Sequence, residues 1–176
     1  SLAIREKAFG PEHFSVANSL GNLASLYDNQ GRYAEAEPLY QRSLAINEKI
    51  LGPEHPSVAT SLNNLATLYI DQGRYAEGER LIQKSLAIRE KAFGPEHFSV
   101  AISLNNLGLL YHKLGRYAEV EPLYQRSLAI NEKILGPEHP RVAISLNNLA
   151  GLYNNQGRYA EVEPLYKRSL AINEKI

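Results

Sequence analysis

The sequence of 176 residues contains no cysteine, methionine or tryptophan, and it has no excess of either charge. Without cysteine, disulfide bonds and thiolate chemistry are excluded. The 19 basic and 19 acidic residues give a formal net charge of zero. A basic excess, which nucleic acid or an anionic membrane would attract, is therefore missing, and neither partner is expected. Because even an initiator methionine is absent, we expect the sequence to be part of a longer protein.

Long hydrophobic runs are absent as well. No stretch approaches the roughly 18 consecutive apolar residues of a membrane-spanning helix, and the N-terminus shows no signal-peptide pattern. We therefore expect a cytoplasmic protein without a membrane partner. The hydrophobic fraction of 44% and the charged fraction of 22% are typical of a folded domain and exclude a disordered chain.

The sequence does contain an internal repeat with a period of 42 residues. The four units are Ser1–Arg42, Ser43–Lys84, Ser85–Arg126 and Ser127–Arg168, and a stub, Ser169–Ile176, follows them. Units one and three share "IREKAFGPEHF", whereas units two and four share "INEKILGPEHP", so the similarity is closer every 84 residues. A fixed period of this length is the signature of a repeat architecture.

Each unit is predicted to form two helices joined by a tight turn. In the second unit the first helix should span about 57–72, because apolar residues between Val58 and Tyr69 recur at helical spacing. Gly73 ends this helix, and the second helix should span about 75–92, before the Gly-Pro of "GPEH". A single pair cannot bury its apolar face, so the pairs are expected to stack.

The pattern predicts a single all-α array over residues 1–176 with about nine helices. Residues 1–14 hold the remnant of a second helix and a linker. Each of the segments 15–56, 57–98, 99–140 and 141–176 holds a helix pair with its linker.

The segment Leu62–Leu86, "LNNLATLYIDQGRYAEGERLIQKSL", and its three copies resemble the tetratricopeptide repeat. The marker residues of that family are here Leu65, Ala66, Tyr69, Gly73, Tyr75 and Gly78. The ordinary unit has about 34 residues; the longer unit, with "LGPEHP" and "EAEPLY", is similar to the repeats of kinesin light chains. The resemblance implies a right-handed superhelical α-solenoid of antiparallel helix pairs, whose first helices line a concave groove that binds peptides.

Five positions of the first helix vary among the units while their neighbours stay constant. In unit one they are residues 18, 21, 25, 28 and 29, which share one helix face. Constant positions serve packing, so the variable stripe is predicted to face solvent and contact a partner. The predicted groove residues are Asn22, Asn64, Asn106, Asn148, Asn63, Asn105, Asn147, Asn29, Asp71, Lys113, Asn155, His112 and Asn154.

Within this stripe one position is asparagine in all four units: Asn22, Asn64, Asn106 and Asn148. An amide both donates and accepts hydrogen bonds, so it can hold a peptide backbone whatever its side chains, and kinesin-light-chain-like repeats are understood to use groove asparagines in this way. A ladder in which each asparagine bonds the neighbouring helix is an equally good interpretation, and one residue could serve both roles.

The remaining candidates for chemistry favour structural roles. The linker histidines, His13, His55, His97 and His139, lie about one repeat apart, too far for a shared zinc ion, so capping or linker packing is predicted. Recurrent tyrosines such as Tyr27, Tyr33 and Tyr40 should pack in the core. His112 is expected on the groove surface and not as a catalyst. Lys113 is the only basic residue of the stripe, so a clamp for a terminal carboxylate is not expected.

No catalytic constellation, phosphate loop or metal-ligand set can be assembled from the sequence. We therefore predict a scaffold without cofactor or enzymatic activity, which binds a protein or peptide segment. Two alternatives stay open. Apolar faces at the uncapped ends could stack into homo-oligomers, or the segment could be a passive spacer.

Overall fold

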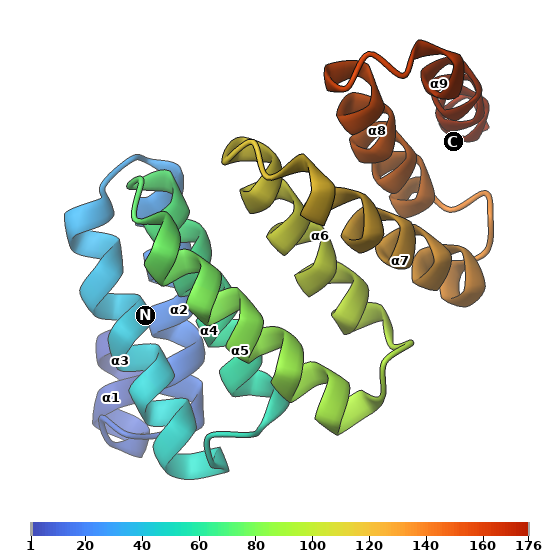
Figure 1. Ribbon diagram of the computed structural model, residues 1–176. Helices are drawn as coiled ribbons and strands as arrows, with labels where there is room; N and C mark the ends of the chain where they lie inside the picture. The colour runs from blue at the N-terminus through green and yellow to red at the C-terminus, as the bar shows by residue number, and fades with distance from the viewer. Residues whose placement is uncertain (1, 176) are drawn as a thin grey trace. The chain divides into compact units, whose positions relative to one another are not determined.

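The computed structural model describes residues 2–175, which form nine α-helices and no strand (Figure 1). The helices are α1 (Leu2–Phe9), α2 (Phe14–Asn29), α3 (Tyr33–Leu51), α4 (Pro56–Asp71), α5 (Tyr75–Phe93), α6 (Phe98–Lys113), α7 (Tyr117–Leu135), α8 (Pro140–Asn155) and α9 (Tyr159–Asn173). The chain divides into two compact units, Ser1–Ala92 and Phe93–Ile176. From here on, "first unit" and "second unit" mean these two parts, and the 42-residue segments are called repeats. Within residues 2–175, no helix has the length and apolar character needed to cross a membrane.

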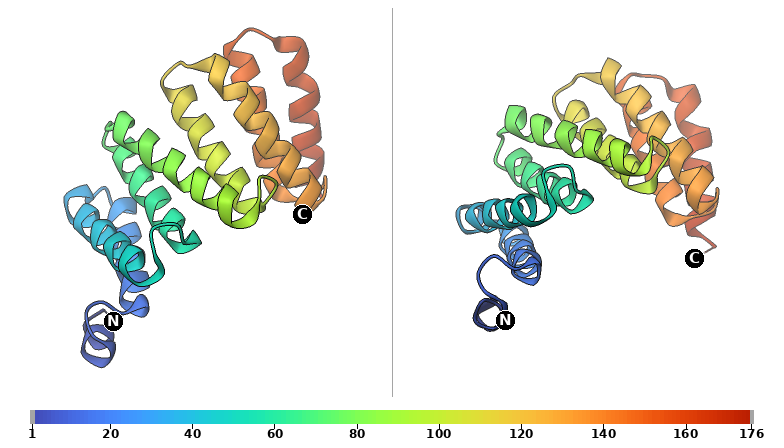
Figure 2. Two further views of the ribbon diagram at one scale, coloured as in Figure 1. Left: turned by 60° about the horizontal axis from the view of Figure 1, so that its bottom comes forward. Right: turned by 90° about the horizontal axis from the view of Figure 1, so that it is seen from below.

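After α1, the helices form antiparallel pairs within each unit: α2 with α3 and α4 with α5 in the first, α6 with α7 and α8 with α9 in the second. The partners of a pair lie side by side in both views of Figure 2. Inside a unit the pairs also stack, because α4 packs on α3 and α8 on α7. Stacked helix pairs are the architecture of an all-α solenoid, which confirms the predicted fold class.

A buried cluster in the first unit shows how this stacking builds the core. Ala36 and Tyr40 of α3 pack against Leu65 and Leu68 of α4, and all four side chains are almost fully buried. Tyr27 and Tyr33 pack at the margin of the same cluster, as the sequence predicted. One cluster thus joins two helix pairs, so that neither pair buries its apolar face alone.

The linker histidines cap the first helices, which confirms the capping role predicted for them. In His55 the ring Nδ1 accepts a hydrogen bond from the backbone N–H of Ser57 at 3.1 Å, and the other three make the equivalent contact. Because His55 is the N-cap, α4 begins at Pro56, one residue earlier than predicted. A proline is tolerated there, since the first helical N–H has no intrahelical partner to lose.

The tight turn inside each pair combines a glycine with an arginine. Gly73 has a φ of 77°, a left-handed conformation that other residues rarely adopt, and it lets Arg74 N donate to Tyr69 O at 2.7 Å. The guanidinium of Arg74 then lies 3.7 Å from the centre of the Tyr69 ring. Its hydrogen bonds to Glu77 lower the pKa of that carboxyl. The glycine with positive φ and the arginine over a tyrosine ring recur in all four turns, so the "GRY" segment is a structural element.

Candidate peptide-binding groove

First helices of consecutive repeats touch inside each unit, and the contacting residues are about one repeat apart in sequence. In the second unit, Asn148 Nδ2 of α8 donates to Asn105 Oδ1 of α6 at 2.7 Å. Two turns further along, Asn155 and His112 are hydrogen-bonded at 2.8 Å. The His112 ring also meets the edge of Tyr117, with 5.4 Å between ring centres. Four of the predicted groove residues are thus brought together in two hydrogen-bonded pairs.

The first unit differs at the equivalent place. Gly21 occupies the position of Asn105, so Asn64 meets no amide oxygen there. In the described part of the chain, Asn22 and Asn64 make no side-chain hydrogen bond to the protein. Asn22 is exposed and Asn64 half-buried. The asparagine ladder is therefore formed between α6 and α8, whereas the same residue type is unengaged between α2 and α4.

In the first unit, two acidic residues occupy the positions that His112 and Asn155 occupy in the second unit. Asp28 of α2 and Asp71 of α4 repel each other, and burial together with this repulsion raises the pKa of Asp28. Asp71 itself is exposed. Like charges at this place are a feature of the first unit alone among the described residues, because Asn155 and His112 carry no like charges at the equivalent positions of the second unit.

The other predicted groove residues do not form one continuous surface. Asn29, Lys113 and Asn154 are exposed near the C-terminal ends of their helices. Asn63 is buried, at 9% exposure. Asn106 is half-buried beside Asn105, and Asn147 lies away from both, next to the outer face of α9.

Each unit has a small hollow between its two first helices, floored by the second helix of the earlier pair. The hollow of the first unit, about 200 Å³, is lined by Asn22 and Asn64 and floored by Asn47 of α3. The hollow of the second unit, about 180 Å³, is lined by Asn105 and Asn106 and floored by Asn131 of α7. We call these the first and second groove pockets.

The two floor residues, Asn47 and Asn131, are not among the groove residues predicted from the sequence, which all lie on first helices. The sequence does contain a signal for these residues. In the four second helices, the position after the constant "SLAI" is polar but varies, and it is occupied by Asn47, Arg89, Asn131 and Asn173. A polar position that changes while its neighbours remain constant marks a site worth examining.

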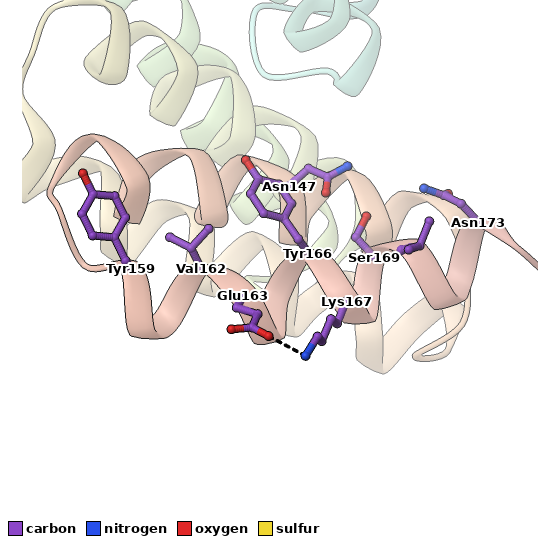
Figure 3. A pocket seen from close by; sticks show the side chains of 9 residues that line it. Asn147, Tyr159, Val162, Glu163, Tyr166, Lys167, Ser169 and Asn173 are labelled. Carbon is purple, nitrogen blue, oxygen red and sulfur yellow. Dashed lines mark ion pairs between the residues drawn. The ribbon is translucent and has the colours of Figure 1, made fainter.

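A larger, apolar hollow of about 970 Å³ lies on the outer face of α9 (Figure 3). Tyr166 and Leu170 are 46% and 57% exposed there, whereas the equivalent Tyr124 of α7 is 2% exposed because α8 packs on α7. At the rim, Glu163 and Lys167 form an ion pair at 2.5 Å. This face has the composition of a repeat interface and is open in this chain.

Among residues 2–175, no three His, Asp or Glu side chains gather so that they could hold a metal ion. The groove offers amides, hydroxyls and single charges, which are groups for recognising a partner through hydrogen bonds.

Comparison with known proteins places these features in a family. Models of the tetratricopeptide repeat match residues 16–57, 57–133 and 99–175. No curated protein matches the sequence closely enough to count as a relative.

Many solved structures resemble the chain, and three of them are described here. BtubC (BKLC) from P. vanneervenii has a TM-score of 0.82 at 26% identity, over 91% of this chain and 64% of that one, so the chain spans less than two thirds of its length. A putative kinesin light chain from Podospora anserina with nearly identical TPR-like repeats has a TM-score of 0.79 at 33% identity, covering 99% and 82%. Aspartyl phosphate phosphatase F from Bacillus subtilis, at 15% identity, 92% and 41% coverage and a TM-score of 0.81, shares the fold.

The family models cover nearly the whole chain, and a solved structure with repeats of the kinesin light chain type matches it over 99% of its length at 33% identity. The helix pairs, the glycine turns and the capped first helices are the physical counterpart of that match. The chain belongs to the tetratricopeptide repeat family.

Proposed function

We propose that this chain is a protein-interaction scaffold that holds a peptide or protein segment along its first helices, in the manner of kinesin-light-chain-like repeats. Tetratricopeptide repeats generally mediate protein–protein interaction and are typically not enzymes. The observation that carries the proposal is the pair of unengaged amides, Asn22 and Asn64, on the variable stripe beside the first groove pocket. An amide with both donor and acceptor unused can bond the backbone of an extended peptide.

The two units provide a matched test of this proposal. The variants are Asn64→Ala, whose amide is unengaged, and Asn148→Ala, whose amide is bonded to Asn105. Peptides selected from a displayed random library on the unaltered chain are the probes. We expect Asn64→Ala to weaken their binding about tenfold or more at unchanged melting temperature, since a lost hydrogen bond to a ligand leaves the folded chain intact.

The control variant should behave in the opposite way. Asn148→Ala removes a contact between α6 and α8, so it should lower the melting temperature by a few degrees. Selection of no peptide at all, or full binding by Asn64→Ala, would contradict the proposed role of the groove.

A second candidate function, self-association through the ends, is favoured by the exposure of Tyr166 and Leu170 on α9. On α2 the complementary position is also open: Leu26 is 51% exposed, whereas its equivalent Leu68 is fully buried against α3. The two faces are the halves of an interface that the chain forms internally between α3 and α4. Sedimentation at increasing concentration distinguishes the cases, because association that Leu26→Arg abolishes supports this function and a monomer at all concentrations rejects it.

A further inference from the structure

We propose that each groove pocket accepts a carboxamide, the side chain of Asn or Gln, from a bound peptide. The inference rests on the proposed function and names the side-chain class that the groove selects. Its basis is an unpaired hydrogen-bond acceptor at the floor of each pocket, which occurs twice in the same setting.

The floor amides are buried and their orientation is set by a serine. Asn47 is 4% exposed, and its Nδ2 donates to Ser61 Oγ at 2.9 Å. Ser61 in turn donates its hydroxyl proton to the carbonyl oxygen of Ser57 at 3.2 Å. A hydroxyl has one proton to give, so toward Asn47 it can only accept, and the amide nitrogen must face it.

This arrangement leaves the amide oxygen without a donor. Among the described residues, no group donates to Oδ1 of Asn47. Buried acceptors are nearly always paired in folded proteins, because an unpaired one loses its bond to water without a replacement. A donor carried by a ligand would remove that cost, so the pocket floor favours ligand groups with an N–H.

The second pocket repeats the network with equivalent residues. Asn131 is 7% exposed, and its Nδ2 donates to Ser145 Oγ at 3.0 Å. Ser145 donates to the carbonyl oxygen of Arg141 at 3.1 Å. Here too Oδ1 has no donor in the part of the chain that the structure describes. The same unpaired oxygen therefore occurs at equivalent positions of the two units, so it belongs to the repeated network and is not a feature of one side chain.

The walls of the first pocket decide which donor fits. Around Asn47 they consist of Asn18, Asn22, Thr60 and Asn64, with no charged side chain among the described lining residues. A ligand ammonium or guanidinium would therefore lose its hydration without meeting an opposite charge. A carboxamide is neutral, its NH₂ can donate to the floor oxygen, and its own oxygen can accept from an unengaged wall amide.

The second pocket keeps the floor but has a different rim. Ile102 and Ile144 replace Asn18 and Thr60, and Arg141 adds a positive charge that disfavours a cationic ligand. The aliphatic rim can cover the methylene groups of a longer side chain. We therefore expect the second pocket to prefer Gln over Asn, while the first accepts both.

The test uses the whole chain and three blocked amino acids with straight side chains: the N-acetyl, N-methylamide derivatives of glutamine, glutamate and methionine. Binding is followed through the ¹⁵N side-chain NH₂ signals of Asn47 and Asn131 on titration. We expect saturable shifts of both signals with the glutamine probe. Binding of the glutamate and methionine probes should be about tenfold weaker or absent, because all three probes have the same backbone amides and only the glutamine side chain supplies a donor to the floor.

Matched variants assign the shifts to the pockets. Asn47→Leu should abolish binding at the first pocket and leave the Asn131 signals titrating as before; Asn131→Leu should do the reverse. If a floor variant fails to fold, Asn64→Leu tests the first pocket from its half-buried wall. Equal shifts with all three probes, or no saturation with the glutamine probe, would overturn the proposal and leave the floor oxygens to water.

The displayed library separates this inference from the proposed function. Selected peptides that need Asn64 but show no enrichment of Asn or Gln would sink the carboxamide pockets and leave the scaffold function standing. Saturable glutamine binding with no selected peptide would support the pockets and contradict the scaffold function.

Discussion

Single serine hydroxyls join the two helices of every pair in this chain. Ser127 of α7, which is 1% exposed, donates to the carbonyl oxygen of Ala101 on α6 at 3.0 Å, and the equivalent serine does so in each of the other three pairs. This explains why a small polar residue is constant at a buried position of every second helix: the hydroxyl fits where the two helices approach closely, and its proton is donated in a hydrogen bond.

Removal of this hydroxyl should measurably weaken the second unit. We expect Ser127→Ala to lower the free energy of unfolding by about 1 kcal/mol, the net value of a typical buried hydrogen bond. Urea denaturation followed by circular dichroism measures the change. An unchanged midpoint would show that the bond between α6 and α7 adds nothing to the packing around it.

The acidic pair of the first unit makes stability depend on pH. Burial and the nearby Asp71 raise the pKa of Asp28, so the folded chain binds this proton more tightly than the unfolded chain. Stability from this residue therefore increases as the pH falls through the raised pKa, and it is lost above it.

Asp28→Asn should raise stability at pH 7, by on the order of 0.5 kcal/mol, because it removes a repulsive and partly buried charge. The gain should disappear below about pH 4, where both the folded and the unfolded aspartate are protonated. Thermal melts at a series of pH values check this expectation, and Asp71→Asn is the control, which should reproduce part of the gain. A gain that is equal at low and neutral pH would rule out charge as its cause.

The asparagines show which residue properties sequence could not settle. Four identical residues suggested one role, yet Asn148 is bonded to Asn105 whereas Asn64 is unengaged, because Gly21 replaces the partner. The difference arises from a contact about one repeat away in sequence. A helical pattern fixes the face on which a side chain lies, but not the opposing residue of the next helix.

At the scale of the elements, local signals were sufficient. The first helix of the second 42-residue repeat was predicted at 57–72 and is Pro56–Asp71; its partner was predicted at 75–92 and is Tyr75–Phe93. The start and the end of the first helix depend on residues adjacent to it in sequence, the capping His55 and the left-handed Gly73. Such boundaries need no knowledge of tertiary contacts, which explains why the prediction differs by a single residue.

Two glycines inside helices of the second unit should respond in opposite ways to alanine. A Cβ at Gly108 of α6 would lie 2.4 Å from a ring carbon of Tyr124, which is buried, whereas a Cβ at Gly151 of α8 would meet no atom within 4 Å. Alanine is favoured over glycine in a helix by about 0.5–1 kcal/mol, but overpacking a core costs about 1–3 kcal/mol.

We therefore expect Gly151→Ala to stabilise the chain and Gly108→Ala to destabilise it, the latter by a net amount of about 1–2 kcal/mol. Chemical denaturation of the two variants side by side gives both signs. Stabilisation by Gly108→Ala would mean that the Tyr124 ring can move aside to give the arrangement of the first pair, where Ala24 and Tyr40 occupy the equivalent positions of one buried cluster.

At the scale of the whole molecule, identical residues differ in their importance according to whether a further repeat covers them. Tyr124 of α7 is covered by α8, and burial raises its pKa to about 12. Tyr166 occupies the same repeat position on α9 and is 46% exposed. Sequence alone assigns both tyrosines to the core; their difference arises from the stacking of α8 on α7 and from the open face of α9.

Truncation of the two tyrosines measures this difference. Tyr124→Ala should cost about 3–5 kcal/mol, as expected for a large buried side chain, whereas Tyr166→Ala should cost less than about 1 kcal/mol in dilute solution. Denaturation over a range of protein concentrations adds a second readout. If copies of the chain stack on α9, the cost of Tyr166→Ala will grow with concentration, because association stabilises the folded chain by mass action. A cost that stays small throughout means that no copy binds there, and it assigns the stability of the second unit to contacts within each helix pair and between α7 and α8.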